Sequence, residues 1–105
     1  MSIKKSDNSA VVGIVVIGRN EGNRLLLSLQ SMQESNCPIV YVDSGSSDDS
    51  VSIATQLADI VHCLDKSKPF SAARARNEGF EKLTSAFKAI KLGVAIYKYT
   101  RRNTP

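Results

Sequence analysis

The sequence predicts an α/β domain, a three-layer sandwich in which helices cover both faces of a mostly parallel, doubly wound sheet. Short apolar runs at 11–17, 39–42 and 60–64 have the unbroken hydrophobic character of parallel strands buried on both faces. Segments of helical periodicity separate these runs, and spacers of this length fit right-handed crossovers between parallel strands. We therefore expect strands in the order 3-2-1, with a fourth strand near 94–98 beside the first.

Length and composition fit one small domain. The chain has 105 residues, of which 42% are hydrophobic and 23% charged. No apolar run approaches the roughly 18 residues of a membrane span, and the polar first residues carry no signal-peptide core. Cys37 and Cys63 are too few for a disulfide framework or a zinc site, so we interpret them as reduced thiols of a cytoplasmic protein. We expect residues 1–9 to be disordered and 101–105 to be a frayed end.

Charge is distributed unevenly along the chain, whose net charge is +4. Residues 1–81 contain eight basic and all ten acidic residues, whereas 82–105 contain six basic residues and no acid. A basic tail is typical of proteins that bind nucleic acid or anionic membranes. These six charges are scattered among apolar residues and form no dense run, so a solvated helix face and a frayed end explain them better. We expect no nucleic-acid partner.

The first two helices follow the first two strands. After the polar stretch 18–23, apolar residues recur at helical spacing: Leu25, Leu26, Leu29 and Met32. Asn36 and Pro38 end this helix. Ser46 and Asp49 lie three residues apart and resemble a capping box, which would begin a second helix behind the second strand.

A third helix is predicted after the third strand. Ser71 can cap its first turn, and the helix would run from Ala72 to about Lys91. Gly93 would end it, before the fourth strand begins. The core positions of this helix would be Phe80, Leu83, Phe87 and Ile90.

Polar residues collect where the strands end. The second strand ends in Asp43, and the Ser-Gly-rich stretch 44–48 follows. The carboxyl ends of parallel strands form the edge at which open α/β sheets bind ligands. Asp43 would then face a ligand there. The alternative is purely local, because Asp and Ser also favour turns and helix caps.

Basic residues reach the same edge from the third strand and helix. Lys66 and Lys68 lie in the loop after the third strand, and Arg74 and Arg76 follow in the helix. The two arginines are two residues apart and point in different directions, so we expect Arg74, one turn from the helix start, to face the cleft. Asn77 shares its face at i+3. Carboxylates that accept from a base or ribose, together with cations that meet phosphates, suit a nucleotide, whereas surface solvation is the alternative for each residue.

Several other kinds of site are disfavoured. No G-x-G-x-x-G follows the first strand, and no Walker A sequence is present. Ser44 has no nearby base and does not form a nucleophile elbow. His62 is the single histidine and lies inside an apolar run, so we interpret it as a core or edge residue.

Three segments together resemble the amino-terminal half of family 2 glycosyltransferases, which have the type-A nucleotide-diphospho-sugar transferase fold. Residues 15–25 look like the first strand and Asn-Glu loop of that family. Residues 40–50 look like its second strand and Asp-x-Gly-Ser-Thr-Asp-Gly turn, and residues 73–79 are similar to its Ala-Arg-Asn-x-Gly helix. The resemblance covers about residues 10–81.

The resemblance implies that residues 10–100 form the half of a glycosyltransferase domain that binds a nucleotide-sugar donor, most often a UDP-sugar. It places Asp43 against the base, the first-strand loop beside it, and the basic residues of the third helix near the nucleotide. The expected binding residues are Gly18, Arg19, Asn20, Glu21, Asp43, Ser44, Arg74 and Asn77.

The sequence departs from the family pattern after Glu81, the last acidic residue. The full-length family binds a divalent cation, Mg or Mn, through an Asp-x-Asp motif after its fourth strand, where this chain reads Tyr97 to Arg102 without an acid. We therefore expect no metal ligand, no cofactor and no catalytic residue in this chain. We expect a truncated domain that is inactive alone. The alternative is a non-catalytic remnant or protein-interaction module of the same fold.

Overall fold

Three strands and three helices alternate along the chain, and a fourth strand follows them. The structure is a computed structural model that describes residues 12–88, 90 and 92–98. The elements in chain order are β1 (Val12–Gly18), α1 (Asn23–Gln33), β2 (Ile39–Asp43), α2 (Ser50–Leu57), β3 (Ile60–Cys63), α3 (Ala72–Ala86) and β4 (Leu92–Lys98). The expectations for 1–9 and 101–105 lie outside the described residues.

The sheet has the predicted topology. Its strand order is β3-β2-β1-β4, and each neighbouring pair is parallel. The prediction of order 3-2-1 with a fourth strand beside the first is confirmed. In register, Gly18 lies opposite Asp43, and Asp43 lies opposite Cys63. The carboxyl ends of β1, β2 and β3 therefore meet at one edge of the sheet.

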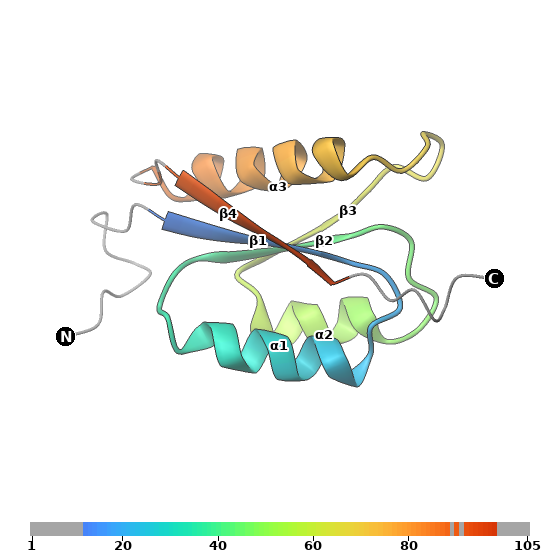
Figure 1. Cartoon of the computed structure of the whole chain (residues 1–105), viewed down its shortest axis with the longest axis horizontal. Helices are drawn as coiled ribbons and strands as arrows, with labels where there is room; N and C mark the ends of the chain where they lie inside the picture. Colours follow the sequence, from blue (N-terminus) through green and yellow to red (C-terminus); the bar gives the residue numbers. More distant parts are fainter. Residues whose placement is uncertain (1–11, 89, 91, 99–105) are drawn as a thin grey trace.

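Helices cover the two faces of the sheet as separate layers. Figure 1 shows α3 on one side of the sheet and α1 with α2 on the other, which confirms the three-layer sandwich. The side chains of a strand alternate between faces, so β1 and β2 supply both cores. The α3 core contains Val15, Ile17, Val40, Val42, Leu64, Ala75, Leu83 and Ile90. The core under α1 and α2 contains Ile14, Val16, Leu25, Leu29, Ile39, Tyr41 and Ala54.

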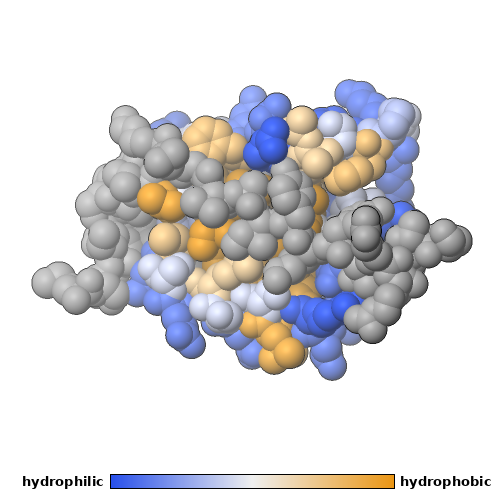
Figure 2. Space-filling view, viewed as in Figure 1, coloured by the Kyte–Doolittle hydropathy of each residue, from blue (hydrophilic) through white to orange (hydrophobic). Residues whose placement is uncertain are grey.

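The outer surfaces of the helices are mainly polar. In the space-filling view, hydrophilic residues occupy much of the upper and lower margins, where the helices lie, with hydrophobic groups between them (Figure 2). Leu27 and Phe70 are the large hydrophobic residues that are well exposed among the described residues, at 65% and 50% of their surface. No helix within the described ranges is long and apolar enough to cross a membrane.

Gly79 determines how closely α3 approaches the sheet. A Cβ atom at this position would lie 2.7 Å from Val15 Cγ1 and 2.9 Å from Val42 Cγ2. Contacts under 3 Å between carbon atoms are repulsive, so a side chain here would push α3 away from β1 and β2. The glycine of the Ala-Arg-Asn-x-Gly segment is therefore required for helix packing.

The predicted end of the third helix is wrong. α3 ends at Ala86 instead of about Lys91, because Phe87 has extended backbone angles of −124° and 97° and closes the helix through its N–H to Leu83 O. Gly93 does not end the helix but lies in β4, paired with Gly13. The chain must leave the helix early because β4 pairs with β1 from Leu92 onward. The four predicted core residues still pack together, since Leu83 and Ile90 are buried and Phe80 and Phe87 pack against them.

Among the predicted caps, one is confirmed and one is wrong. The Ser71 hydroxyl accepts the N–H of Arg74 at 3.2 Å and caps α3. Ser46 and Asp49 form no capping box, because α2 begins at Ser50 and its N-cap residue Asp49 makes no side-chain cap bond. The Ser46 hydroxyl is instead used at the end of β2, where it donates to Asp43.

Candidate functional site

A cleft of about 320 Å³ lies at the carboxyl ends of the strands. Three loops enclose it, because the order β3-β2-β1 makes the loops that leave these strands neighbours. We call residues 19–22 and 44–49 the paired loops and residues 64–71 the cleft loop. The lining residues are Arg19, Ser44, Gly45, Leu64, Asp65, Lys66, Lys68, Phe70 and Arg74.

The lining of the cleft is strongly cationic. It contains four basic residues and a single acidic residue, Asp65. The Asp65 carboxylate accepts the backbone N–H and the hydroxyl of Ser67, at 2.9 and 2.8 Å. These bonds stabilise the charged carboxylate and lower the pKa of Asp65 below its usual value. Phe70 adds a half-exposed aromatic ring at the rim. This combination suits an anion that carries a flat ring.

Asp43 does not line the cleft, and the expectation that it would be partly exposed there is wrong. The residue is buried, with 3% of its surface exposed. One oxygen accepts the Tyr41 hydroxyl at 2.7 Å and the Ser46 hydroxyl at 2.5 Å. The other accepts the backbone N–H groups of Gly45 and Ser46, at 3.0 and 2.7 Å. These bonds fit the local alternative, in which Asp43 organises the turn after β2.

Tyr41 shares this buried site. Its hydroxyl lies under the turn, and the ring is fully buried in the core beneath α1 and α2. Burial raises the pKa of Tyr41 far above its usual value, and the Asp43 carboxylate beside it raises that pKa further. The tyrosine thus remains a neutral donor to Asp43.

Asn20 joins the paired loops to each other. Its backbone lies in the left-handed region, with φ of 54°, which turns the side chain toward the second loop. The amide oxygen accepts the N–H groups of Ser47 and Asp48, at 2.8 and 3.3 Å. The N–H of Asn20 donates to the Ser46 hydroxyl at 2.8 Å. Asn20 is therefore a loop-fixing residue, placed behind the cleft.

Glu21 and Gly18 belong to the same connection. Glu21 is 6% exposed, and its carboxylate lies 3.6 Å from the Arg24 guanidinium. The hydroxyl of the buried Ser50 accepts the N–H groups of Glu21 and Gly22, both at 3.1 Å. Gly18 O accepts the N–H of Ser44 at 3.0 Å. These residues fix the paired loops instead of lining the cleft.

Three of the eight predicted binding residues line the cleft, namely Arg19, Ser44 and Arg74. Gly18, Asn20, Glu21 and Asp43 lie behind it in the hydrogen bonds of the paired loops. Asn77 is exposed on α3 and is not among the lining residues, and the same holds for Arg76.

Sequence reasoning missed most of the cleft loop as a binding segment. Lys66 and Lys68 were expected near the sheet edge, but Leu64, Asp65 and Phe70 were not singled out as binding residues. Open α/β sheets bind ligands at the carboxyl ends of their strands, and this applies to the loop after β3 as much as to Asp43 at the end of β2. A cationic loop that ends in Pro69-Phe70 was the available signal.

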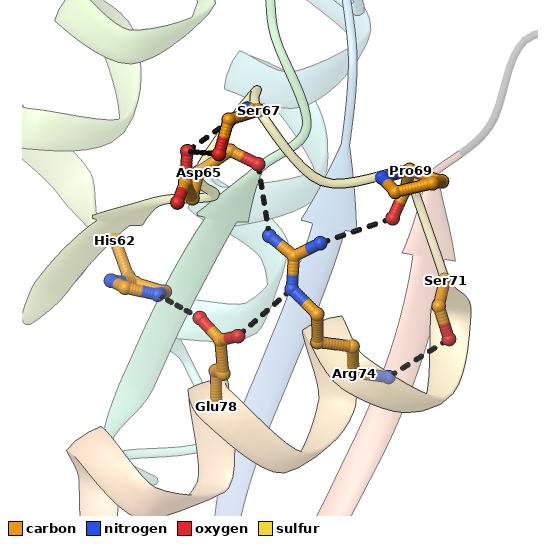
Figure 3. Close-up of polar contacts among 7 residues, drawn as sticks. All are labelled: His62, Asp65, Ser67, Pro69, Ser71, Arg74 and Glu78. Carbon is orange, nitrogen blue, oxygen red and sulfur yellow. Dashed lines mark hydrogen bonds and ion pairs between the residues drawn. The ribbon is translucent and has the colours of Figure 1, made fainter.

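Arg74 is held from three directions (Figure 3). Its Nε donates to Glu78 Oε2 at 2.9 Å, Nη1 donates to Pro69 O at 3.0 Å, and Nη2 donates to Asp65 O at 3.1 Å. The other oxygen of Glu78 lies 2.7 Å from His62 Nε2. The hydrogen bonds from His62 and Arg74 lower the pKa of Glu78, so that its carboxylate is charged at neutral pH. His62 lies in β3 at the edge of the sheet, within the prediction of a core or edge residue, and its partner Glu78 was not predicted.

The described residues do not fit a resident divalent cation. Within 12–88, 90 and 92–98, no group of three or more His, Cys, Asp or Glu side chains could hold a metal ion.

The fold and the cleft together define an α/β domain with a cleft of mainly basic lining at the carboxyl ends of parallel strands. The sequence profile of Glycosyl transferase family 2 matches residues 13–90. The chain belongs to this family, and the resemblance of its three segments is confirmed. No curated protein and no solved structure matches the chain.

Proposed function

We propose that the cleft binds the nucleotide diphosphate part of a nucleotide-sugar donor, with UDP-sugars as the donor class. The observation that carries this proposal is the cationic lining, with an aromatic ring at its rim, at the strand ends of a chain that belongs to Glycosyl transferase family 2. A volume of about 320 Å³ lies at the lower end of the range for small-molecule sites.

Each part of the lining has a role in this proposal. Lys66, Lys68 and Arg19 extend into a cleft with few counter-charges, so they meet the two phosphates. Phe70 offers its ring for stacking on the base, a contact that needs an exposed aromatic face. Ser44 and Gly45 form the floor beside them. The paired loops hold this floor in place through buried hydrogen bonds.

The proposal for this chain is donor binding without sugar transfer. The sequence has no acidic residue after Glu81 that could supply the Asp-x-Asp motif or the base that the resemblance calls for. The residues described at the cleft bind and orient, and none is assigned to the transfer step. We infer a cytoplasmic site for this binding, since Cys37 and Cys63 are both free thiols.

Calorimetric titration of the chain with UDP tests the proposal. We expect binding that weakens by roughly tenfold or more when Lys66 and Lys68 are both replaced by alanine, because each lysine contributes about 1 kcal/mol through a charge-assisted bond. Lys82→Ala is the matched control, an exposed lysine of α3 that does not line the cleft.

Absence of UDP binding at millimolar concentration would refute the proposal. So would equal effects of the double variant and the control. Titration with single-stranded DNA completes the test, since salt-sensitive DNA binding without UDP binding would identify a nucleic-acid partner instead.

A further inference from the structure

Arg74 lines the cleft, but its donors are directed into the protein. A guanidinium has five N–H donors in a planar fork. All three nitrogen atoms of Arg74 donate to protein acceptors, which are Glu78 on its own helix and two backbone carbonyls of the cleft loop. The side chain is 19% exposed. Its geometry is that of a cross-link between α3 and the cleft loop.

The two carbonyl acceptors lie at opposite ends of the lysine-bearing segment. Asp65 O and Pro69 O are four residues apart, and Lys66 and Lys68 lie between them. One planar group therefore fixes both ends of a short loop (Figure 3). Inside the loop, the Ser67 bonds to the Asp65 carboxylate fold the chain into a tight turn.

Glu78 fixes the guanidinium in turn. It lies one helical turn after Arg74, so the two side chains meet on one face of α3. Its second oxygen is 2.7 Å from His62 Nε2 in β3, which gives the carboxylate a fixed partner on the sheet. A continuous chain of polar contacts thus runs from β3 through α3 to the cleft loop.

We propose that Arg74, oriented by Glu78, is a positioning residue that holds the cleft loop so that Lys66 and Lys68 are ordered before the nucleotide diphosphate binds. This inference rests on the proposed donor binding. The benefit is preorganisation, because a loop that is already fixed has less conformational freedom to lose when the ligand binds.

The Glu78→Ala variant separates this role from direct phosphate binding by Arg74. Removal of a carboxylate beside a cationic cleft strengthens anion binding by simple electrostatics, and it would release Arg74 toward a phosphate. The positioning role has the opposite consequence. We expect Glu78→Ala to weaken UDP binding by roughly tenfold, because the loop and its lysines must then be ordered at the moment of binding.

The Arg74→Lys variant gives a second comparison. Lysine keeps the positive charge, but a single ammonium on a flexible stem cannot reproduce a planar fork that bonds one carboxylate and two carbonyls. We expect this variant to weaken UDP binding about as much as Glu78→Ala. Glu81→Ala is the matched control, since it removes an exposed carboxylate from the same helix without touching Arg74.

Amide hydrogen exchange at residues 65–70 tests the positioning role without any ligand. We expect faster exchange in Glu78→Ala and Arg74→Lys than in the wild type and in Glu81→Ala, with unchanged exchange in β1 and β2. Unchanged exchange in the cleft loop, or UDP binding that Glu78→Ala leaves equal or stronger, would overturn the inference. If the wild type binds no UDP, the proposed function fails, and the exchange data still decide whether Arg74 fixes the loop.

Discussion

The paired loops and the cleft loop leave the same edge of one sheet, yet most of their polar side chains serve different purposes. In and directly beside the paired loops, the side chains of Asn20, Asp43 and Ser50 accept backbone N–H groups of residues in those loops. In the cleft loop, Lys66 and Lys68 extend into the cleft. Residues that look like ligands in the sequence can therefore stabilise the loops, while the cleft loop contributes two of the four basic residues that line the cleft.

The largest expected effect comes from Asp43→Asn, which breaks the paired loops. An amide in place of the buried carboxylate loses charge-assisted bonds and turns an NH₂ group toward existing donors. We expect the free energy of unfolding to fall by about 3 kcal/mol, measured by urea denaturation. Asp49→Asn is the control, an exposed aspartate without a side-chain cap bond.

UDP titration of the same variant decides whether Asp43 stabilises the paired loops or contacts the nucleotide itself. We expect the folded Asp43→Asn protein to lose less UDP affinity than the Lys66 and Lys68 double variant, because Asp43 does not line the cleft and acts on it only through the paired loops. A variant of native stability that has lost UDP binding would instead make Asp43 a ligand.

Gly79→Ala disturbs the other side of the comparison by moving α3, which carries Arg74 and Glu78. The new Cβ would lie 2.7 Å from Val15 Cγ1, so we expect a loss of about 2 kcal/mol in stability. Helix propensity alone predicts a gain in stability of about 1 kcal/mol for this change. A loss of stability therefore identifies the steric clash as the dominant effect, and a gain identifies helix propensity. Chemical denaturation measures the change in stability. A stabilised variant would show that the space between α3 and the sheet accommodates a methyl group.

Alkaline pH tests the buried Tyr41–Asp43 pair without a change in either loop. Because the pKa of Tyr41 is raised in the folded protein, its proton is retained where the unfolded chain, with a tyrosine pKa of 10.0, releases it. The retained Tyr41 proton contributes to the free energy of unfolding. This contribution is fully present below pH 10 and declines above it, by about 1.4 kcal/mol per pH unit. Urea denaturation can be measured at test conditions of pH 9, 10 and 11. The free energy of unfolding should fall more steeply with pH for the wild type than for Tyr41→Phe. Parallel declines would contradict the assignment.

The smallest expected effect comes from Phe70→Ala, which sharpens the part played by the cleft loop. Phe70 is 50% exposed, so its removal should change stability little. Loss of a stacking surface should weaken UDP binding by about 1 kcal/mol, measured by calorimetry. Leu27→Ala removes a side chain that is 65% exposed on α1 and should leave UDP binding unchanged. Equal affinities of both variants and the wild type would remove Phe70 from the site.

The strands were predictable because a short, continuous apolar run is typical of a parallel strand that is buried on both faces. The end of α3 was not, since Phe80, Leu83, Phe87 and Ile90 keep helical spacing although the helix stops at Ala86. A loop residue such as Ile90 can fill the core at the position that a longer helix would supply. Side-chain spacing therefore predicts core membership more safely than it predicts the backbone that delivers it.

The site was predictable only to the level of the sheet edge. Strand ends identify which loops meet there, and Arg19, Ser44 and Arg74 do line the cleft at that edge. The direction of Asn20 depends on backbone N–H groups 27 and 28 residues away along the chain. Local sequence carries no information about such partners, so inward and outward polar side chains cannot be told apart before the fold is known.

The bond between Asn20 and Ser47 has a consequence for which positions tolerate substitution. Asn20 contributes its side chain to this bond, whereas Ser47 contributes only its backbone N–H, and the Ser47 side chain is exposed. Any residue except proline supplies the same N–H, so the residue type at position 47 can vary among homologous chains. Position 20 needs an amide oxygen on a residue that accepts a positive φ, which asparagine does readily. A sequence profile of this turn should therefore vary at the exposed serine and remain narrow at the asparagine.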